Sequence, residues 1–338
     1  MIARIARLLL AAALAAAAGS AEAAARDACD SLVPALVGGP MLPKGSDIAV
    51  IRWLGNANYE VGFGGKVYLF DTYYDRVSRS RPLGFSVADV KRADVIFLSH
   101  AHFDHMSDIV PVARQTGAKV VGAPITIETA VKLGLPPQQA VTAKGGETLH
   151  FGDLTVEIAL ARHSTIQDGL IDAYANLYKV ETRASTPEEI AHTKDVTSRG
   201  TFAPDVIDKG TLAFALVLRN GFKIVAIGSA GPITDGDRDL ARKLGRADVA
   251  IVAYQPHAVA ERQIPDTWAL IDLFDPRLYL PAHHDHSFGT WLDLGLEPLF
   301  QKLRDEKPGT KFAAPLYRSA ICVATRGARR GTIVKLRY

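Results

Sequence analysis

The ten-residue stretch "SHAHFDHMSD", residues 99–108, contains three histidines and two aspartates. It directly follows the apolar run "DVIFL", which is typical of a buried strand. Loops at strand ends often carry functional side chains, so this stretch is the first candidate for a functional site.

The spacing within this stretch suits metal binding. His100 and His102 are two positions apart, so in an extended segment both imidazoles point to the same side and can reach one metal ion. Asp104 and His105 follow at once, and a turn can direct them toward a second ion. Neutral imidazole and carboxylate groups suit Zn²⁺, so we predict a zinc site here rather than a solvated polar loop.

This stretch cannot complete a catalytic zinc site, which needs three protein ligands and an open position. Further histidines follow later strand-like runs: His163 comes after "LTVEIALAR", and His283 and His284 come after "RLYLPA". We therefore expect ligands from these strand ends to join the first cluster.

The chain alternates apolar strand-like runs with helix-like segments. Each half runs from antiparallel hairpins, joined by the turns "GFGGK" and "RNG", into strand–helix pairs. This order predicts an α/β (mixed α+β) fold, an αββα sandwich with two mixed sheets face to face and helices outside. We expect one domain over residues 26–338, with a polar, irregular insertion at about 164–209.

Helices are expected over 107–117, 125–134, 237–245, 265–274 and 290–306. The helix over 265–274 is expected to begin at its proline.

These residues resemble the metallo-β-lactamase superfamily. Its HxHxDH motif is matched by "HAHFDH" (100–105), its later single histidine by His163, and its late-strand histidine by His283. An early-strand aspartate that orders the metal loop is matched by Asp71, and the resemblance spans about residues 48–290. The opening "IRWLGNANYEVGFGGKVYLFD" looks most like the branch of L-ascorbate-6-phosphate lactonase-like and N-acylphosphatidylethanolamine phospholipase-like proteins.

The resemblance implies two sets of metal ligands: His100, His102 and His163 in one, and Asp104, His105 and His283 in the other. The sequence departs from most hydrolases of the superfamily at Ser229, where they have an aspartate that bridges two metals. One or two zinc ions therefore both fit the sequence. Asp235 is a rival for the bridging role, although a turn or helix-capping role is favoured for it.

The resemblance also implies the chemistry, which is hydrolysis by a zinc-bound hydroxide that attacks a carbonyl or phosphoryl centre. Asp104 would be both a ligand and a catalytic proton acceptor, and Asp71 would support the catalytic loop. An ester or lactone substrate is favoured, with a β-lactam or a phosphodiester as alternatives. A non-hydrolytic zinc-binding module is a further alternative, whereas a di-iron oxidoreductase is disfavoured because those enzymes resemble HxExDH and position 102 is His.

Three further residues are candidates for contacts near the metals. His284 could lie behind a ligand or replace one, His257 could face the substrate, and Tyr73 could form a wall of the pocket. Each also has an ordinary interpretation as a loop, capping or packing residue.

The first 25 residues predict a secretory signal peptide. Two arginines precede the apolar run "LLLAAALAAAA", and small residues follow it, with cleavage expected after Ala23 or Ala25. The mature protein is thus expected to be exported, to the periplasm or outside the cell, with no membrane span. Cys29 and Cys322 could form a disulfide there or stay as free thiols.

The bulk composition agrees with an ordinary globular protein that acts on a small molecule. The formal net charge is +3, with acidic and basic residues mixed along the chain and no basic cluster. We therefore expect no nucleic-acid partner.

Overall fold

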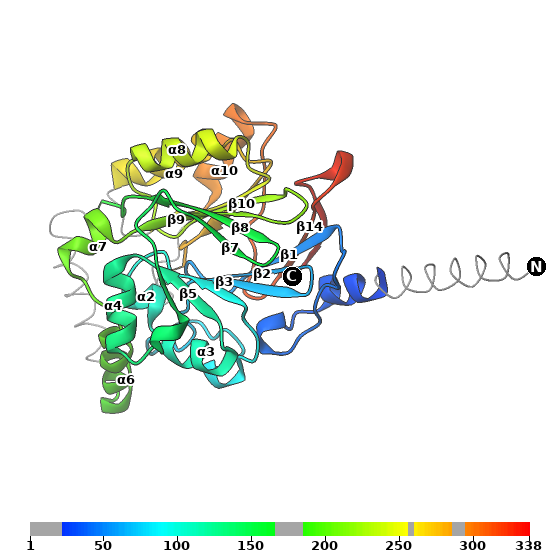
Figure 1. Cartoon of the computed structure of the whole chain (residues 1–338). Helices are drawn as coiled ribbons and strands as arrows, with labels where there is room; N and C mark the ends of the chain where they lie inside the picture. The colour runs from blue at the N-terminus through cyan, green and yellow to red at the C-terminus, as the bar shows by residue number, and fades with distance from the viewer. Residues whose placement is uncertain (1–21, 166–184, 256–259, 286–294) are drawn as a thin grey trace, which may run out of the picture.

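The computed structural model describes residues 22–165, 185–255, 260–285 and 295–338. Two β-sheets lie face to face, with α8, α9 and α10 on the outer side of one and α3 and α4 on the outer side of the other (Figure 1). This arrangement confirms the αββα sandwich predicted from the alternation of strands and helices. Within these residues, no helix has both the length and the apolar character needed to cross a membrane.

The first sheet has eight strands and combines antiparallel and parallel pairs. In spatial order they are β15 (Ile333–Arg337), β14 (Ala320–Ala324), β1 (Ile48–Trp53), β2 (Tyr59–Phe63), β3 (Lys66–Phe70), β4 (Val95–Phe97), β5 (Lys119–Gly122) and β6 (Ala140–Thr142). Gly64 and Gly65 close the predicted hairpin between β2 and β3 with φ of 59° and 79°, which glycine adopts without steric cost.

The second sheet has seven strands and repeats the same plan, with antiparallel pairs first and parallel pairs after β10. In spatial order they are β13 (Lys311–Phe312), β12 (Leu278–Ala282), β11 (Val249–Ala253), β10 (Lys223–Ile227), β9 (Leu212–Val217), β8 (Leu154–Leu160) and β7 (Thr148–Phe151). Each sheet thus combines antiparallel hairpins with parallel strand–helix pairs, as the sequence pattern predicted, although β14 and β15 from the end of the chain join the first sheet.

The α-helices follow the expected order along the chain. They are α2 (Phe103–Met106), α3 (Ile109–Thr116), α4 (Pro124–Lys132), α6 (Pro187–Ser198), α7 (Pro204–Lys209), α8 (Asp235–Leu244), α9 (Ala260–Phe274) and α10 (Glu297–Glu306). Short 3₁₀ turns lie at Ala35–Val37, Val87–Asp89, Pro137–Gln139 and Gly327–Arg329.

Three expectations about helices were wrong, one of which is the start of the helix expected over 290–306, because α10 begins only at Glu297. The insertion at 164–209 is not irregular throughout, because it contains α6 and α7. Thr186 caps α6 by accepting a hydrogen bond from the Glu189 backbone, a local signal that the polar composition obscured. Helix α9 begins at Ala260 rather than at Pro265, which lies inside the helix.

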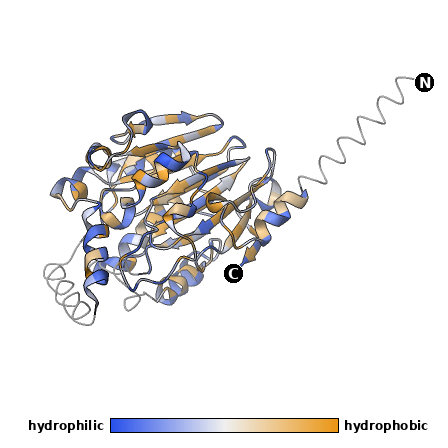
Figure 2. Ribbon diagram, turned by 90° about the horizontal axis from the view of Figure 1, so that it is seen from below, coloured by the Kyte–Doolittle hydropathy of each residue, from blue (hydrophilic) through white to orange (hydrophobic). Residues whose placement is uncertain are grey.

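The central strands are apolar on both faces because the middle of each sheet is covered on both sides. In β3, Tyr68 and Phe70 pack in the core between the two sheets, whereas Val67 and Leu69 pack beneath the helices. Figure 2 shows mainly hydrophobic strands in the interior, and outer helices that mix hydrophobic and hydrophilic residues. The core therefore holds the strands rigidly, and their ends can present side chains at fixed positions.

Cys29 and Cys322 form a disulfide across a sequence separation of 293. It joins the helical residues 22–30 to β14, and both cysteines are buried. A buried Arg52–Glu60 ion pair holds the same segment, because Arg52 Nη2 donates to the Ala28 carbonyl at 2.8 Å. Of the two alternatives left open for the cysteines, the structure has the disulfide.

Candidate metal centre

The candidate site lies where several strands of both sheets end. Within three residues of its end, each of these strands is followed by one of the polar residues or motifs singled out in the sequence. These are Asp71 after β3, the HxHxDH motif after β4, His163 after β8, Ser229 after β10 and His283 after β12. The fold brings six of these side chains into two groups, and the donor atoms of each group lie within 4.8 Å of one another. The membership of both groups is the one that the resemblance implied.

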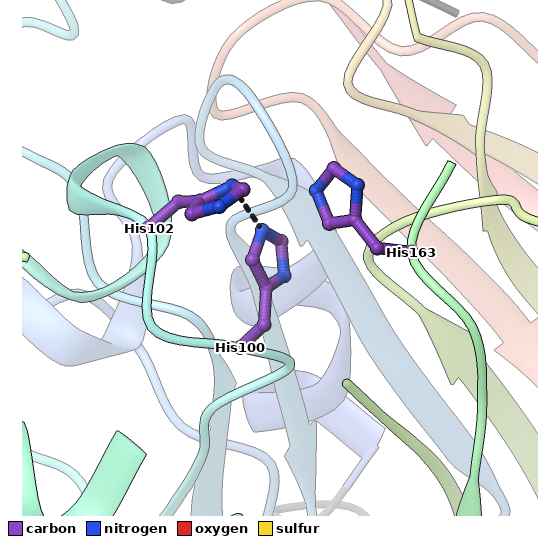
Figure 3. Close-up of side chains that lie close together, drawn as sticks. All are labelled: His100, His102 and His163. Atoms are coloured by element: carbon purple, nitrogen blue, oxygen red, sulfur yellow. Dashed lines mark hydrogen bonds between the residues drawn. The ribbon is translucent and has the colours of Figure 1, made fainter. Parts of the chain in front are cut away.

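His100, His102 and His163 form the first group, and their rings converge from two separate segments of the chain (Figure 3). His100 Nε2 lies 3.1 Å from His102 Nδ1. Burial, together with the neighbouring histidines, lowers the pKa of His102 to about 3, and burial lowers the pKa of His163 to about 4. All three rings are therefore neutral at pH 7, which is the form that binds metal ions.

Asp104, His105 and His283 form the second group. Asp104 Oδ2 lies 3.2 Å from His283 Nε2 and 3.7 Å from His105 Nε2. Burial by itself would raise the pKa of Asp104, but the adjacent His105 and His283 outweigh it and hold this pKa well below its usual range. Asp104 is thus a carboxylate at neutral pH and brings a negative charge to the site.

Asp71 lies behind the second group and orients it. Its Oδ2 is 2.8 Å from His105 Nδ1, and its two oxygens also accept hydrogen bonds from the Ser99 backbone and hydroxyl at 2.7 and 2.8 Å. This contact fixes the Nδ1 proton of His105 and leaves Nε2 facing Asp104. A carboxylate that holds a histidine in this way is typical of metal sites.

Asn56 is a site residue that sequence reasoning missed. Its side-chain nitrogen donates to the Asp104 carbonyl and, at 3.2 Å, to Asp104 Oδ2. Its own carbonyl accepts a hydrogen bond from the His283 backbone at 2.8 Å. The signal was "GNAN" after β1, a polar loop at a strand end, but loops of this kind are too common to single out one residue.

Three residues at this site have strained backbone conformations. Asn56, Asp71 and His283 have φ of 49°, 54° and 55°, in the left-handed region that non-glycine residues seldom adopt. Such strain persists only where the surroundings enforce it, and it often marks functional positions.

Ser229 is buried, and its hydroxyl is hydrogen-bonded to two other residues of the chain. Its hydroxyl accepts hydrogen bonds from the Ser164 backbone at 3.0 Å and from Gln255 Nε2 at 2.7 Å. Ser229 thereby fixes the residue next to His163. Asp235 is the exposed first residue of α8, with Thr234 as its cap, so it is not a ligand.

Of the other candidate residues, Tyr73 and His284 pack against neighbouring aromatic side chains. Tyr73 is fully buried and packs edge-on against Phe103, so it forms no open wall. The His284 ring stacks on Trp53 at 4.2 Å between centroids. His257 lies outside the described residues.

The two groups fit metal ions by the chemistry of their donors. Five imidazoles and one carboxylate form a set that suits Zn²⁺ and other divalent transition metals. His163 Nδ1 lies 2.9 Å from the Ser164 carbonyl, which fixes its proton there and directs Nε2 inward, as Asp71 does for His105.

Comparisons with known proteins find metal-dependent hydrolases that are similar to this chain. Residues 66–177 match the model of the β-lactamase superfamily domain. A UPF0173 metal-dependent hydrolase from Cupriavidus necator is 26% identical over 268 residues, which cover 77% of this chain and 83% of that protein.

Solved structures share the fold at low sequence identity. Igni18, a metallo hydrolase from Ignicoccus hospitalis, is 14% identical with a TM-score of 0.57 and covers 81% of this chain and 98% of its own. CmlA, a diiron β-hydroxylase from Streptomyces venezuelae, is 14% identical with a TM-score of 0.51 and covers 84% of this chain and 55% of its own. Residues 66–177 are thus similar to the β-lactamase superfamily domain, and the chain as a whole shares the fold of these two solved structures.

Proposed function

We propose that this protein is a zinc-dependent hydrolase of small esters or lactones. The observation that carries the proposal is the pair of adjacent donor groups, one of three neutral histidines and one with the Asp104 carboxylate. His100, His102 and His163 would hold one ion, and Asp104, His105 and His283 a second. Zn²⁺ in such a site supplies an activated water near neutral pH and polarises the bond under attack.

The residues of the chain contribute positioning and proton transfer. Asp104 is ionised at neutral pH and lies among histidines, so it can accept a proton from the attacking water and orient that water. Asp71 and Asn56 keep His105 and Asp104 in place, so that little reorganisation is needed during the reaction. Catalysis would therefore depend on both donor groups together.

The segment that resembles lactonase-like proteins supports a cyclic or open-chain ester as the substrate. It supplies Asn56 and Asp71, which both contact the second donor group. A β-lactam is the second candidate, because Ser229 stands where the bridging aspartate of other hydrolases would be, as in one subclass of β-lactamases.

The test uses residues 26–338 loaded with zinc and assayed against a lactone, a β-lactam and a phosphodiester. His102→Ala should remove hydrolysis and lower bound metal, whereas His150→Ala, on exposed strand β7, should change neither. Undiminished hydrolysis by His102→Ala would refute the assignment. Bound zinc without hydrolysis of any ester, lactam or phosphodiester would favour a non-hydrolytic zinc-binding module, and Ser229→Asp would then be the next variant.

The proposal includes export to an oxidising compartment and action on a small molecule rather than on nucleic acid. The buried Cys29–Cys322 disulfide supports export, because such bonds persist mainly outside the reducing cytoplasm. The predicted signal peptide lies almost wholly outside the described residues. Fractionation of the native host, with protein sequencing of the mature amino terminus, tests this part, and a cytoplasmic protein that retains residues 1–23 would refute it.

A further inference from the structure

An exposed aromatic side chain lies against one of the candidate ligands. Phe202 is 62% exposed, yet its ring lies 4.6 Å from the His102 ring between centroids, with an angle of 31° between the planes. Phe202 comes from the segment between α6 and α7, and the HxHxDH loop lies about 100 residues earlier in the sequence. One face of the ring therefore covers a candidate ligand while much of the remainder is open to solvent.

The backbone around Phe202 is fixed to the loop that carries His102. The Thr201 backbone donates to the Ala101 carbonyl at 2.8 Å. A Cβ atom at Gly200 would lie 2.4 Å from the Phe103 backbone nitrogen, so only glycine allows this close approach. The position of Phe202 beside His102 is thus built by two backbone contacts and does not depend on the ring alone.

The exposure of the ligands indicates where the site opens. His102 and Asp104 are each 6% exposed, whereas the other four side chains of the two groups are at most 2% exposed. A substrate must approach from the side on which His102 and Asp104 can be reached. Phe202 stands at that opening, against His102.

We propose that Phe202 determines substrate specificity by packing against an apolar group next to the bond that is hydrolysed. The inference rests on the proposed hydrolase function and deepens it. It assigns to this site esters or lactones with an alkyl or aryl substituent, rather than small polar ones. An apolar chain laid along the ring would remove both surfaces from water, which favours binding in proportion to the buried area.

The structure also suggests a competing role for Phe202, which is to hold the His102 ring in place. The two roles differ in what Phe202→Ala should change. A positioning role predicts weaker metal binding for every ligand, whereas a specificity role predicts weaker binding only for ligands with an apolar chain.

The test measures binding to the zinc-loaded protein by calorimetry and so does not depend on turnover. The probes are acetohydroxamate and octanohydroxamate, which share a metal-binding head and differ in the length of the apolar chain. Covering on the order of 60 Å² of apolar surface corresponds to about a tenfold gain in affinity. We expect the longer probe to bind wild type about tenfold more tightly than the shorter one.

Phe202→Ala should reduce this ratio to about two while leaving acetohydroxamate affinity and zinc content unchanged, and Phe202→Leu should retain part of it. Tyr338→Ala is the matched control, because Tyr338 is an aromatic residue that is 57% exposed at the carboxyl terminus. An unchanged ratio in Phe202→Ala, or a loss of zinc with the ratio retained, would overturn the inference alone. If neither probe bound wild type, the proposed metal site itself would be refuted.

Discussion

The Cys29–Cys322 disulfide should contribute several kcal/mol to the stability of this protein. The bond closes a loop with a sequence separation of 293 in a chain of 338 residues. Loop-closure entropy scales with the logarithm of loop length, and for this loop it corresponds to about 5.7 kcal/mol at 25 °C as an upper value. Residual structure in the unfolded chain reduces this, so we expect a loss of about 3–5 kcal/mol on reduction.

The assay is urea unfolding of residues 26–338 with and without a phosphine reductant, monitored by far-ultraviolet circular dichroism. Because the same side chains are present in both states, the difference isolates the covalent link. If reduction lowers the free energy of unfolding by about 4 kcal/mol, the Tm in a thermal melt should fall by roughly 6 °C for a chain of this size. Hydrolysis and metal content should be retained at temperatures where the reduced protein is folded, because the disulfide joins residues 22–30 to β14, away from the donor groups.

Cys29→Ala combined with Cys322→Ala is the control, and its stability should not respond to the reductant. A difference below 1 kcal/mol between oxidised and reduced wild type would refute the loop-entropy reasoning. It would mean that the packing of Ala28 and the Arg52–Glu60 ion pair hold the amino-terminal segment without the bond.

Two further predictions concern the donor groups. Asp71→Asn should weaken metal binding by about 10- to 100-fold at the group that contains His105, because an amide holds the His105 Nδ1 proton less strongly than a carboxylate does. Competition with a chelator measures the metal affinity, with the exposed Asp235→Asn as the control. Unchanged metal affinity in Asp71→Asn would contradict the role assigned to Asp71. Because burial lowers the pKa of His102 to about 3 and of His163 to about 4, the unfolded chain binds more protons than the native one below about pH 6.5. The metal-free protein should therefore lose about 2 kcal/mol of stability for each of these two rings between pH 7 and pH 5, and His100, whose pKa burial lowers well below its usual value, adds to this loss. Urea unfolding measures the loss, and His102→Gln should reduce it by about 2 kcal/mol. A flat profile would contradict the buried, neutral state of these rings.

Much of the fold could be predicted from local patterns in the sequence. Strands covered on both sides read as continuous apolar runs, as in β10 and β11, and glycines mark the hairpin between β2 and β3. The insertion was harder to predict, because α6 is mostly polar and its packing depends on residues distant in the sequence. The start of helix α9 was also hard to predict, because Pro265 is typical of a helix start but lies inside this helix.

The sequence by itself determined the donor residues of the candidate site. The HxHxDH motif places four of them within six positions, and the strand-like runs pointed to His163 and to His283 or His284. The resemblance to the metallo-β-lactamase superfamily then implied His283. Local spacing is sufficient here because each donor lies in the short segment that follows a strand, and these segments meet at one edge of the two sheets.

Only the tertiary structure decided which residues support and surround those donors. Asn56 reaches Asp104, Ser229 holds Ser164, and Phe202 covers His102, although each pair is between 48 and 100 residues apart in the sequence. No periodicity or spacing encodes such contacts, because they depend on how the two sheets and the insertion pack together. The physical reason is that a side chain's chemistry is local, whereas its neighbours are set by the global packing of the chain.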